Sequence, residues 1–333
     1  MVVRGEGSLR WFAFAAPLVA ALAVDAKPHY REVDITSLGN ARPFAINDAG
    51  IMAVQTVLNG QLLSFLYDTG KGEIVRTFPS ADRVTVVSNN GNAAGPTSGN
   101  GSWFVGQDGV RLAIPLAQPA GINDAGEVVG SAIRSTQAVL YSTANGTRTI
   151  LGLGGIQSLA NGINSAGQVT GWSTLPDNVT AHAFLWSEGT IEDLGTLAGD
   201  GFSKGNAIDD EGNVVGRAPT ASGEDHAFLF DRNGMHDLGT LPGCTRSEAT
   251  GINEKGTIVG TSQLCSSFAG EHVFLYRHGR LSDLNDLAPA ADGSVYVRVF
   301  GINAAGSIIG FALTPEGRAR AFLLVRDHGD DDD

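Results

Sequence analysis

The chain has 333 residues, of which 45 are glycine, and 17% of its residues are charged. Its formal net charge of −13 at pH 7 argues against nucleic acid or an anionic membrane as the main partner, because an acidic surface is repelled by both. Abundant glycine together with low charge is typical of a chain with many tight turns between buried strands.

Residues 1–26 have the form of a secretory signal peptide. Arg4 and Arg10 give it a positive start, and residues 11–24 form an apolar run of 14 residues. Cleavage would follow Ala23 or Ala26. A retained membrane anchor is the weaker alternative, because the run is too short to span a bilayer comfortably. We therefore expect a soluble exported protein, either periplasmic or secreted from the cell.

From Tyr30 onward the chain is an approximate repeat built on a Gly-Ile-Asn-x-x-Gly motif. The seven copies lie 35 to 50 residues apart and are marked by Asn47, Ser88, Asn123, Asn164, Asp209, Asn253 and Asn303. A period of this length is typical of propeller blades or of helical repeats. Short runs of β-branched and aromatic residues between Gly- and Asn-bearing turns favour strands, and no run has the apolar spacing of an amphipathic helix.

Each copy is predicted to form four antiparallel strands. In the fourth copy the first strand ends at residues 162–164, and the others cover residues 168–172, 181–186 and 190–197. The Asn-x-x-Gly sequence suits the first turn, because Asn accepts a backbone N–H and Gly tolerates the left-handed conformation. Four antiparallel strands in about 42 residues are typical of one β-propeller blade.

The last copy ends after its third strand, at residues 321–325, and its fourth strand is found at the N-terminus instead. Residues 32–39 align with residues 191–198 of the fourth copy. An N-terminal strand that completes the last blade would close the ring and remove two open sheet edges. The predicted fold is all-β: a seven-bladed β-propeller of four-stranded antiparallel blades in one domain, residues 27–326, followed by an acidic, disordered tail at residues 327–333.

Comparison of the copies with one another indicates a pair of ionisable side chains in four of the blades. The pairs expected between the third and fourth strands are His182 with Asp193, His226 with Asp237, His272 with Asp283, and Arg320 with Asp34. The first three copies lack both members of the pair. Metal ligation or acid–base chemistry is the weaker interpretation of the histidines, because separate blades would hold them far apart.

Cys244 and Cys265 are the two cysteines of the chain. They flank the first hairpin of the sixth copy, and counting outward from its turn places them opposite each other. In an exported protein this arrangement predicts a disulfide that stabilises an enlarged loop. A redox-active pair would normally have a closer spacing.

Few motifs point to chemistry, and we predict no catalytic residue, cofactor or metal site. Residues 201–205, Gly-Phe-Ser-Lys-Gly, match the G-x-S-x-G motif of serine hydrolases, but that motif requires a strand–turn–helix context that this stretch lacks. Asp48, Asp124, Asp210 and Glu254 occupy one turn position in four copies. They could form an acidic rim on one face, where cation binding is an open alternative.

The HAFLW, DLGTL and GIN-x-x-G-x-VVG motifs, clearest from Gly162 to Leu287, resemble the extracellular HAF repeat family of bacterial exported proteins. The likeness covers nearly all of the expected mature chain. The first two copies depart from it, with Ser64 and Ser102 in place of the histidine. The resemblance implies a location outside the cytoplasm and brings no reaction, cofactor or catalytic residue.

These observations lead to two main hypotheses about function. In the first, the protein is a monomeric, non-enzymatic scaffold that binds a polysaccharide, a protein or a small ligand through loops on one propeller face. The candidate loops are the long insertions at residues 174–179, 220–224, 263–271 and 288–296. The alternative is an exported hydrolase or lyase with a site in the central channel. A third hypothesis is a mainly structural surface protein.

Overall fold

The structure is a computed structural model that describes residues 30–58, 60–99, 101–150, 152–199, 201–266 and 269–327. The predicted signal peptide, residues 1–26, lies outside these ranges. So does the predicted acidic tail, apart from Asp327.

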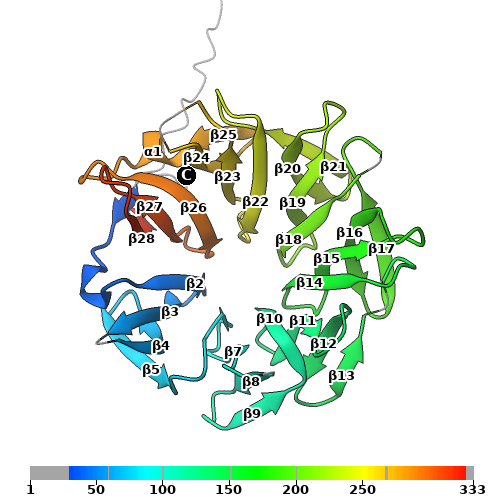
Figure 1. Cartoon of the computed structure of the whole chain (residues 1–333), viewed down its shortest axis with the longest axis horizontal. Helices are drawn as coiled ribbons and strands as arrows, with labels where there is room; N and C mark the ends of the chain where they lie inside the picture. The colour runs from blue at the N-terminus through cyan, green and yellow to red at the C-terminus, as the bar shows by residue number, and fades with distance from the viewer. Residues whose placement is uncertain are drawn as a thin grey trace, which may run out of the picture.

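The described chain forms seven four-stranded antiparallel sheets arranged around a central axis, so the predicted seven-bladed β-propeller is confirmed (Figure 1). We number the blades 1 to 7 in chain order. The first strands are β2 (Arg42–Ile46), β6 (Val86–Val87), β10 (Leu116–Ile122), β14 (Ser158–Ile163), β18 (Lys204–Ile208), β22 (Arg246–Ile252) and β26 (Val295–Ile302). The second strands are β3 (Ile51–Leu58), β7 (Ala93–Pro96), β11 (Glu127–Ala132), β15 (Val169–Thr174), β19 (Val214–Pro219), β23 (Ile258–Gln263) and β27 (Ile308–Leu313).

The outer half of each blade contains the third and fourth strands. The third strands are β4 (Gln61–Asp68), β8 (Ser102–Val105), β12 (Ala138–Ser142), β16 (Ala181–Ser187), β20 (Asp225–Asp231), β24 (Glu271–Arg277) and β28 (Ala319–Arg326). The fourth strands are β5 (Glu73–Phe78), β9 (Arg111–Ile114), β13 (Gly146–Thr149), β17 (Thr190–Gly195), β21 (Gly234–Gly239), β25 (Arg280–Asp283) and β1 (Tyr30–Glu32). Two short helices, η1 (Thr36–Leu38) and α1 (Leu284–Leu287), complete the described structure.

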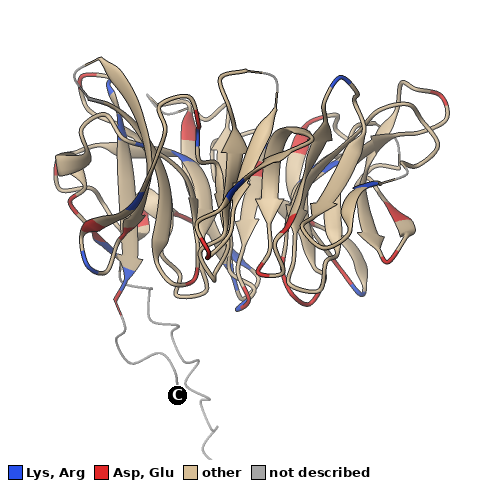
Figure 2. Ribbon diagram, turned by 90° about the horizontal axis from the view of Figure 1, so that it is seen from below, with Lys and Arg blue, Asp and Glu red and all other residues tan. Residues whose placement is uncertain are grey.

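The disc has two faces that differ in the connections they carry. The turn face carries the tight turns between the first and second strands and between the third and fourth strands. The loop face carries the connections between the second and third strands and those that lead from one blade to the next. In the side view, the strands run between the two faces. Most acidic and basic residues lie toward one face or the other (Figure 2).

The repeated turn sequences have the geometry that the sequence predicts. In blade 4, the Asn164 side-chain oxygen accepts the backbone N–H of Gln168 at 2.9 Å, and Gly167 has a φ of 77°. The turn between β16 and β17 has positive φ at both Glu188 and Gly189, 50° and 97°. Two consecutive positive values match the hairpin turn whose twist fits that of the paired strands.

Glycine in the second strand of the repeat is required by close contact with the first strand. At Gly171, a β-carbon would lie 1.9 Å from the backbone oxygen of Leu159. The register of β14 and β15 shifts between Ala160 and Gly162, and this bulge brings the first strand toward its neighbour. A β-carbon would meet the first strand's backbone oxygen equally closely in four other copies, so backbone packing explains this glycine of the repeat: Gly130, Gly216, Gly260 and Gly310.

The N-terminal strand completes blade 7, as predicted. β1 pairs with β28 in antiparallel orientation, with Tyr30 opposite Arg326 and Glu32 opposite Leu324. The predicted strand at residues 32–39 is displaced: regular pairing ends at Glu32, and the chain then turns into η1. The pairing register nevertheless agrees with the alignment, since Ile191 lies opposite Trp186 at the equivalent place in blade 4.

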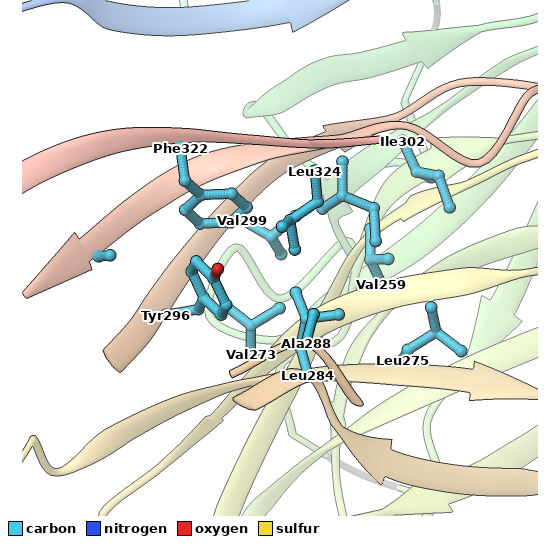
Figure 3. Packing of buried hydrophobic residues seen from close by; sticks show 12 residues of the cluster. Val259, Val273, Leu275, Leu284, Ala288, Tyr296, Val299, Ile302, Phe322 and Leu324 are labelled. Carbon is cyan, nitrogen blue, oxygen red and sulfur yellow. The ribbon is translucent and has the colours of Figure 1, made fainter. Parts of the chain in front are cut away.

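The hydrophobic core is divided among the seams between neighbouring blades. At the seam between blades 6 and 7, Val273 and Leu284 pack with Tyr296 and Phe322 (Figure 3). The rings of Tyr296 and Phe322 are 4.6 Å apart. Each blade therefore depends on its neighbours for burial of its apolar side chains, as expected for a repeat architecture.

Candidate functional site

The repeated Asn of the Gly-Ile-Asn motif joins adjacent blades at the turn face. Its side-chain amide donates to the backbone oxygen of the equivalent residue in the next blade. These bonds run from Asn47 to Ser88 (2.7 Å), Asn123 to Asn164 (3.1 Å), Asn164 to Asp209 (3.0 Å), Asn253 to Asn303 (3.0 Å) and Asn303 to Asn47 (3.0 Å). All of these residues are buried. The motif is therefore part of the scaffold, and we call the seven equivalent residues the turn-face ring.

Two members of the turn-face ring, Ser88 and Asp209, lack the amide donor. In blade 2 the hydrogen bond to the next blade is made by Asn90 instead, whose side-chain amide donates to the backbone oxygen of Asp124 at 2.7 Å. In blade 5 the Asp209 carboxylate has no N–H to donate. It accepts hydrogen bonds from Glu211 and Asn213 of its own turn instead. Burial raises the pKa of Asp209 above its usual value.

The four acidic residues of the predicted rim lie at the same turn position, beside the turn-face ring, and each contacts the preceding blade. Their carboxylates accept backbone N–H groups: Asp48 from Ala304, Asp124 from Asn90, Asp210 from Ser165, and Glu254 from Asp210. Burial, followed by repulsion from Asp210, Asp209 and Asp48, raises the pKa of Glu254. Among the described residues, no three acidic, His or Cys side chains come together as metal ligands. These contacts join blades to one another.

The predicted histidine–aspartate pairs each lie within one blade. The Nδ1 atom of the histidine is 2.8 Å from the carboxylate in His182–Asp193, 2.9 Å in His226–Asp237 and 2.5 Å in His272–Asp283. The aspartates also accept a backbone N–H from their own strand end, as Asp193 does from Gly195 at 2.8 Å. The histidines of different blades do not converge on a common site.

The predicted pair of Arg320 with Asp34 is wrong. The Arg320 guanidinium contacts Glu32 and lies 2.9 Å from Asp292, whereas the Asp34 carboxylate accepts the backbone N–H and hydroxyl of Thr36 at 2.8 and 2.7 Å. The reason is local: β1 ends at Glu32, and the following turn uses the Asp34 carboxylate. The side chain of Arg320 is longer than that of the histidine at the same position in blades 4 to 6, and it contacts Glu32 and Asp292 instead.

Ser203, at the centre of the Gly-Phe-Ser-Lys-Gly stretch, has a structural role. It is fully buried, and its hydroxyl accepts the backbone N–H of Ala183 at 2.8 Å and donates to the backbone oxygen of Gly195 at 2.5 Å. Ser247 makes the equivalent bonds one blade later, to Ala227 and Gly239. The hydroxyl therefore joins one blade to the next and is not exposed as a nucleophile would be.

Cys244 and Cys265 form the predicted disulfide. Arg246 and Gln263 are paired in the hairpin of β22 and β23, so the cysteines lie opposite each other just beyond its open end. The bond ties together two connections on the loop face of blade 6. One of them belongs to the predicted insertion at residues 263–271.

The copies diverge most clearly on the loop-face side of the first two strands. The residue after the second-strand glycine is Trp172 in blade 4, Arg217 in blade 5, Thr261 in blade 6 and Phe311 in blade 7. Directly opposite on the first strands lie Leu159, Lys204, Glu248 and Arg298. A repeat that needed these positions for its fold would keep one residue type there, so this divergence favours a role in recognition.

Several of these divergent side chains form contacts between blades 4 and 5. The rings of Trp172 and Phe202 are 5.6 Å apart, and the Arg217 guanidinium lies 5.5 Å from the Phe202 ring centre. Arg217 also lies 3.9 Å from Glu248 of blade 6. Phe202, in the connection that enters blade 5, remains 37% exposed.

Exposed apolar side chains lie in two loops near Phe202, which is joined by a β-bridge to Ala181 at the end of one of them. Val179 is 86% exposed and Ile156 is 67% exposed. Their two loops are joined by a 2.8 Å hydrogen bond from the backbone N–H of Ile156 to the side chain of Asn178. We call Ile156, Trp172, Val179 and Phe202 the loop-face patch. One predicted insertion, residues 174–179, contributes to it directly.

Pockets occur on both faces. A pocket of about 890 Å³ on the turn face is lined by blades 4 to 6 and includes Glu192 and Phe230. A second turn-face pocket, of about 490 Å³, includes Trp186, whose ring lies 4.8 Å from the Arg148 guanidinium. A pocket of about 530 Å³ lies on the loop face, where blade 7 meets blade 1. Sequence reasoning missed all three, because each is formed by residues of more than one copy.

Comparisons with known proteins agree with the fold. The chain is similar to virginiamycin B lyase from Staphylococcus aureus, with 13% identity and a TM-score of 0.51 over 90% of this chain and 99% of that one. It is also similar to an acylaminoacyl peptidase from Pyrococcus horikoshii, with 10% identity and a TM-score of 0.55 over 85% of this chain and 50% of that one. Likeness at these identities shows the fold alone.

No protein-family model matches the sequence, and no curated protein matches it. Among the described residues, no helix has the length and apolar character needed to cross a bilayer.

Proposed function

We propose that this chain is an exported, non-enzymatic binding protein that recognises its partner through the loop face, and that it belongs with the extracellular HAF repeat proteins. The observation that carries the proposal is the loop-face patch. Its members lie where the copies differ from one another, and three of them expose large apolar side chains, Phe202, Ile156 and Val179. Exposed apolar groups gathered on one face mark interaction sites in soluble proteins.

A protein surface is the partner that best suits this patch. Ile156 and Val179 gain free energy by leaving water for another apolar surface, whereas the hydroxyl groups of a polysaccharide offer them little. Trp172 and Phe202 add aromatic area, which is enriched in the centres of protein interfaces. Arg217 and Glu248 beside them supply a polar edge.

The disulfide and the N-terminal sequence support export. Disulfides persist in oxidising compartments, and Cys244 is bonded to Cys265. Arg4, Arg10 and the apolar run that follows have the form of a signal peptide.

The alternative, a hydrolase or lyase acting in the channel, receives less support. The likeness to a lyase, at 13% identity, transfers no residue. The serine that best fits a hydrolase motif, Ser203, is used to join blades.

Site-specific photocrosslinking in the producing cells tests the proposal. A benzoylphenylalanine residue is placed at Val179 or Phe202 on the loop face, with Val110 as the control. Val110 is 54% exposed but lies on the turn face. We expect one discrete protein adduct from positions 179 and 202 and none from position 110. Adducts only from position 110, a polysaccharide adduct, or no adduct from the loop face would contradict the proposal.

A further inference from the structure

The loop-face pocket at the junction of blades 7 and 1 has features of a small-molecule site that the proposed function does not use. Its volume is about 530 Å³, which lies within the range of ligand pockets. Val33, Ile35, Phe311 and Ala321 supply apolar lining. The remaining lining includes five charged side chains, so the pocket combines apolar and ionic groups: Glu32, Asp34, Arg42, Asp292 and Arg320.

The acidic side chains of this pocket already have partners. Glu32 and Asp292 both contact Arg320, and the buried Tyr296 hydroxyl donates to Glu32 at 2.9 Å. Hydrogen bonds from Thr36 satisfy Asp34 and hold its pKa below the usual value. Each of these three acids therefore has a partner: Arg320 for Glu32 and Asp292, and Thr36 for Asp34.

Arg42 is different, because it lines the same pocket without an ion-pair partner among the described residues. Its guanidinium lies 5.2 Å from the ring centre of Phe44 and 6.0 Å from that of Phe311. The side chain is exposed. Contacts with two aromatic rings fix the plane of the guanidinium while leaving its N–H groups free to donate.

From this arrangement we infer that the pocket binds a monocarboxylate with an apolar body, with the carboxylate on Arg42 and the apolar body against Phe311. A guanidinium pairs with a carboxylate through two parallel hydrogen bonds, which is the contact Arg42 has available. A doubly charged ligand is disfavoured, because Asp34 and Asp292 also line the pocket and would repel the second charge. Both a free acid and the C-terminal residue of a peptide have the required chemistry.

Ligand binding at this place would also stabilise the closed ring. Val33 and Ile35 come from the segment that follows β1, whereas Phe311 and Ala321 come from β27 and β28. The pocket is therefore complete only when the N-terminal segment is docked on blade 7. A ligand that binds only this state raises the unfolding temperature, by an amount that grows with the logarithm of its concentration above the Kd.

Calorimetric titration of the mature protein tests the inference, with 4-phenylbutyrate as the small acid and 4-phenylbutyramide as its neutral counterpart. The peptide Gly-Gly-Phe, with a free or an amidated C-terminus, tests the second source of the same chemistry. We expect at least one acid to bind about tenfold more tightly than its amide and to raise the unfolding temperature. The tighter of the two acids identifies the source.

Two variants then connect binding to the pocket. Arg42→Ala should weaken acid binding about tenfold or more, while its unfolding temperature without ligand falls only slightly, because the ring contacts it loses are at an exposed site. The matched control is Arg280→Ala, which removes an exposed arginine on the turn face of blade 6, outside the pocket. Equal binding of acid and amide, absence of binding by all four probes at millimolar concentration, or equal losses in both variants would overturn the inference. Because Arg42 lies outside the loop-face patch, these results are independent of the crosslinking result.

Discussion

The side-chain amide of Asn303 donates a 3.0 Å hydrogen bond to the backbone oxygen of Asn47, across the seam where the last blade meets the first. The two residues are separated by 256 positions in the sequence. The same bond joins neighbouring blades elsewhere in the turn-face ring, as between Asn164 and Asp209. The ring is therefore closed by two kinds of contact. One is the asparagine hydrogen bond that also joins other neighbouring blades, and the other is the pairing of β1 with β28.

Replacing Asp209 with Asn should stabilise the protein. The new amide can donate to the backbone oxygen of Asn253, as the other ring asparagines do, and Asn213 can turn its side-chain oxygen toward it. We expect about 0.5–1.5 kcal/mol at pH 7, the usual net value of one hydrogen bond. Urea unfolding of both proteins measures the difference.

The pH dependence of that difference gives an independent check. Burial raises the pKa of Asp209, so the native state binds its proton more tightly than the unfolded state does. Wild-type stability therefore gains from protonation as the pH falls through the raised native pKa toward the unfolded value of about 3.9. The advantage of Asp209→Asn should be largest at pH 7 and shrink as this window is entered. A gain that grows on acidification would contradict this account.

Ser203→Ala should destabilise the protein. The substitution leaves the backbone N–H of Ala183 and the oxygen of Gly195 without partners in a fully buried position. The expected loss is about 1–3 kcal/mol, measured by urea unfolding. Ser247→Ala should give a similar loss, because Ser247 makes the equivalent bonds. A stable Ser203→Ala variant that loses a hydrolytic activity would instead favour a catalytic serine.

The histidine–aspartate pairs should differ in their contribution to stability. His182 is 8% exposed, and the side chain of His226 is more exposed than that of His182. Loss of a hydrogen-bond partner costs more in a buried site, so Asp193→Ala should destabilise by about 1–3 kcal/mol and Asp237→Ala by less. Thermal unfolding of the two variants tests the order. The reverse order would show that burial does not control these pairs.

Reduction of the Cys244–Cys265 disulfide should lower the unfolding temperature. The bond closes a loop with a sequence separation of 21, for which loop entropy predicts about 3 kcal/mol. The control is the double variant Cys244→Ser/Cys265→Ser, which should unfold at the reduced protein's temperature whether or not dithiothreitol is present. No change on reduction of the wild type would mean that the hairpin of β22 and β23 is held by its other contacts alone.

The fold was predictable because the repeat encodes it locally. The Asn-x-x-Gly turn, the second-strand glycine and the short apolar runs recur in successive copies. A copy whose pattern is degenerate can therefore be interpreted by comparison with the clearer ones. The displaced β1 shows the limit of this reasoning: alignment gives the register opposite Leu324, but the end of pairing at Glu32 depends on the turn that Asp34 and Thr36 form.

The candidate sites were much less predictable, because they depend on contacts between copies. The contact between the Arg42 guanidinium and the Phe311 ring joins the first and last blades, and no local sequence pattern indicates this contact. The loop at residues 174–179 was identified from its length, but the contact of Trp172 with Phe202 follows from the packing of two blades. The divergence among Trp172, Arg217 and Phe311 was a second signal available in the sequence.

We propose that the repeat holds the fold while the loop-face patch binds the partner. The most direct test measures photocrosslinking from position 179 in an Ile156→Asp background, with Val110→Asp as the matched control on the turn face. Both replaced side chains are more than half exposed, at 67% and 54%, so neither substitution should change the unfolding temperature. We predict that Ile156→Asp abolishes the adduct and that Val110→Asp leaves it intact. An adduct that persists in Ile156→Asp, or disappears equally in both variants, would contradict the claim.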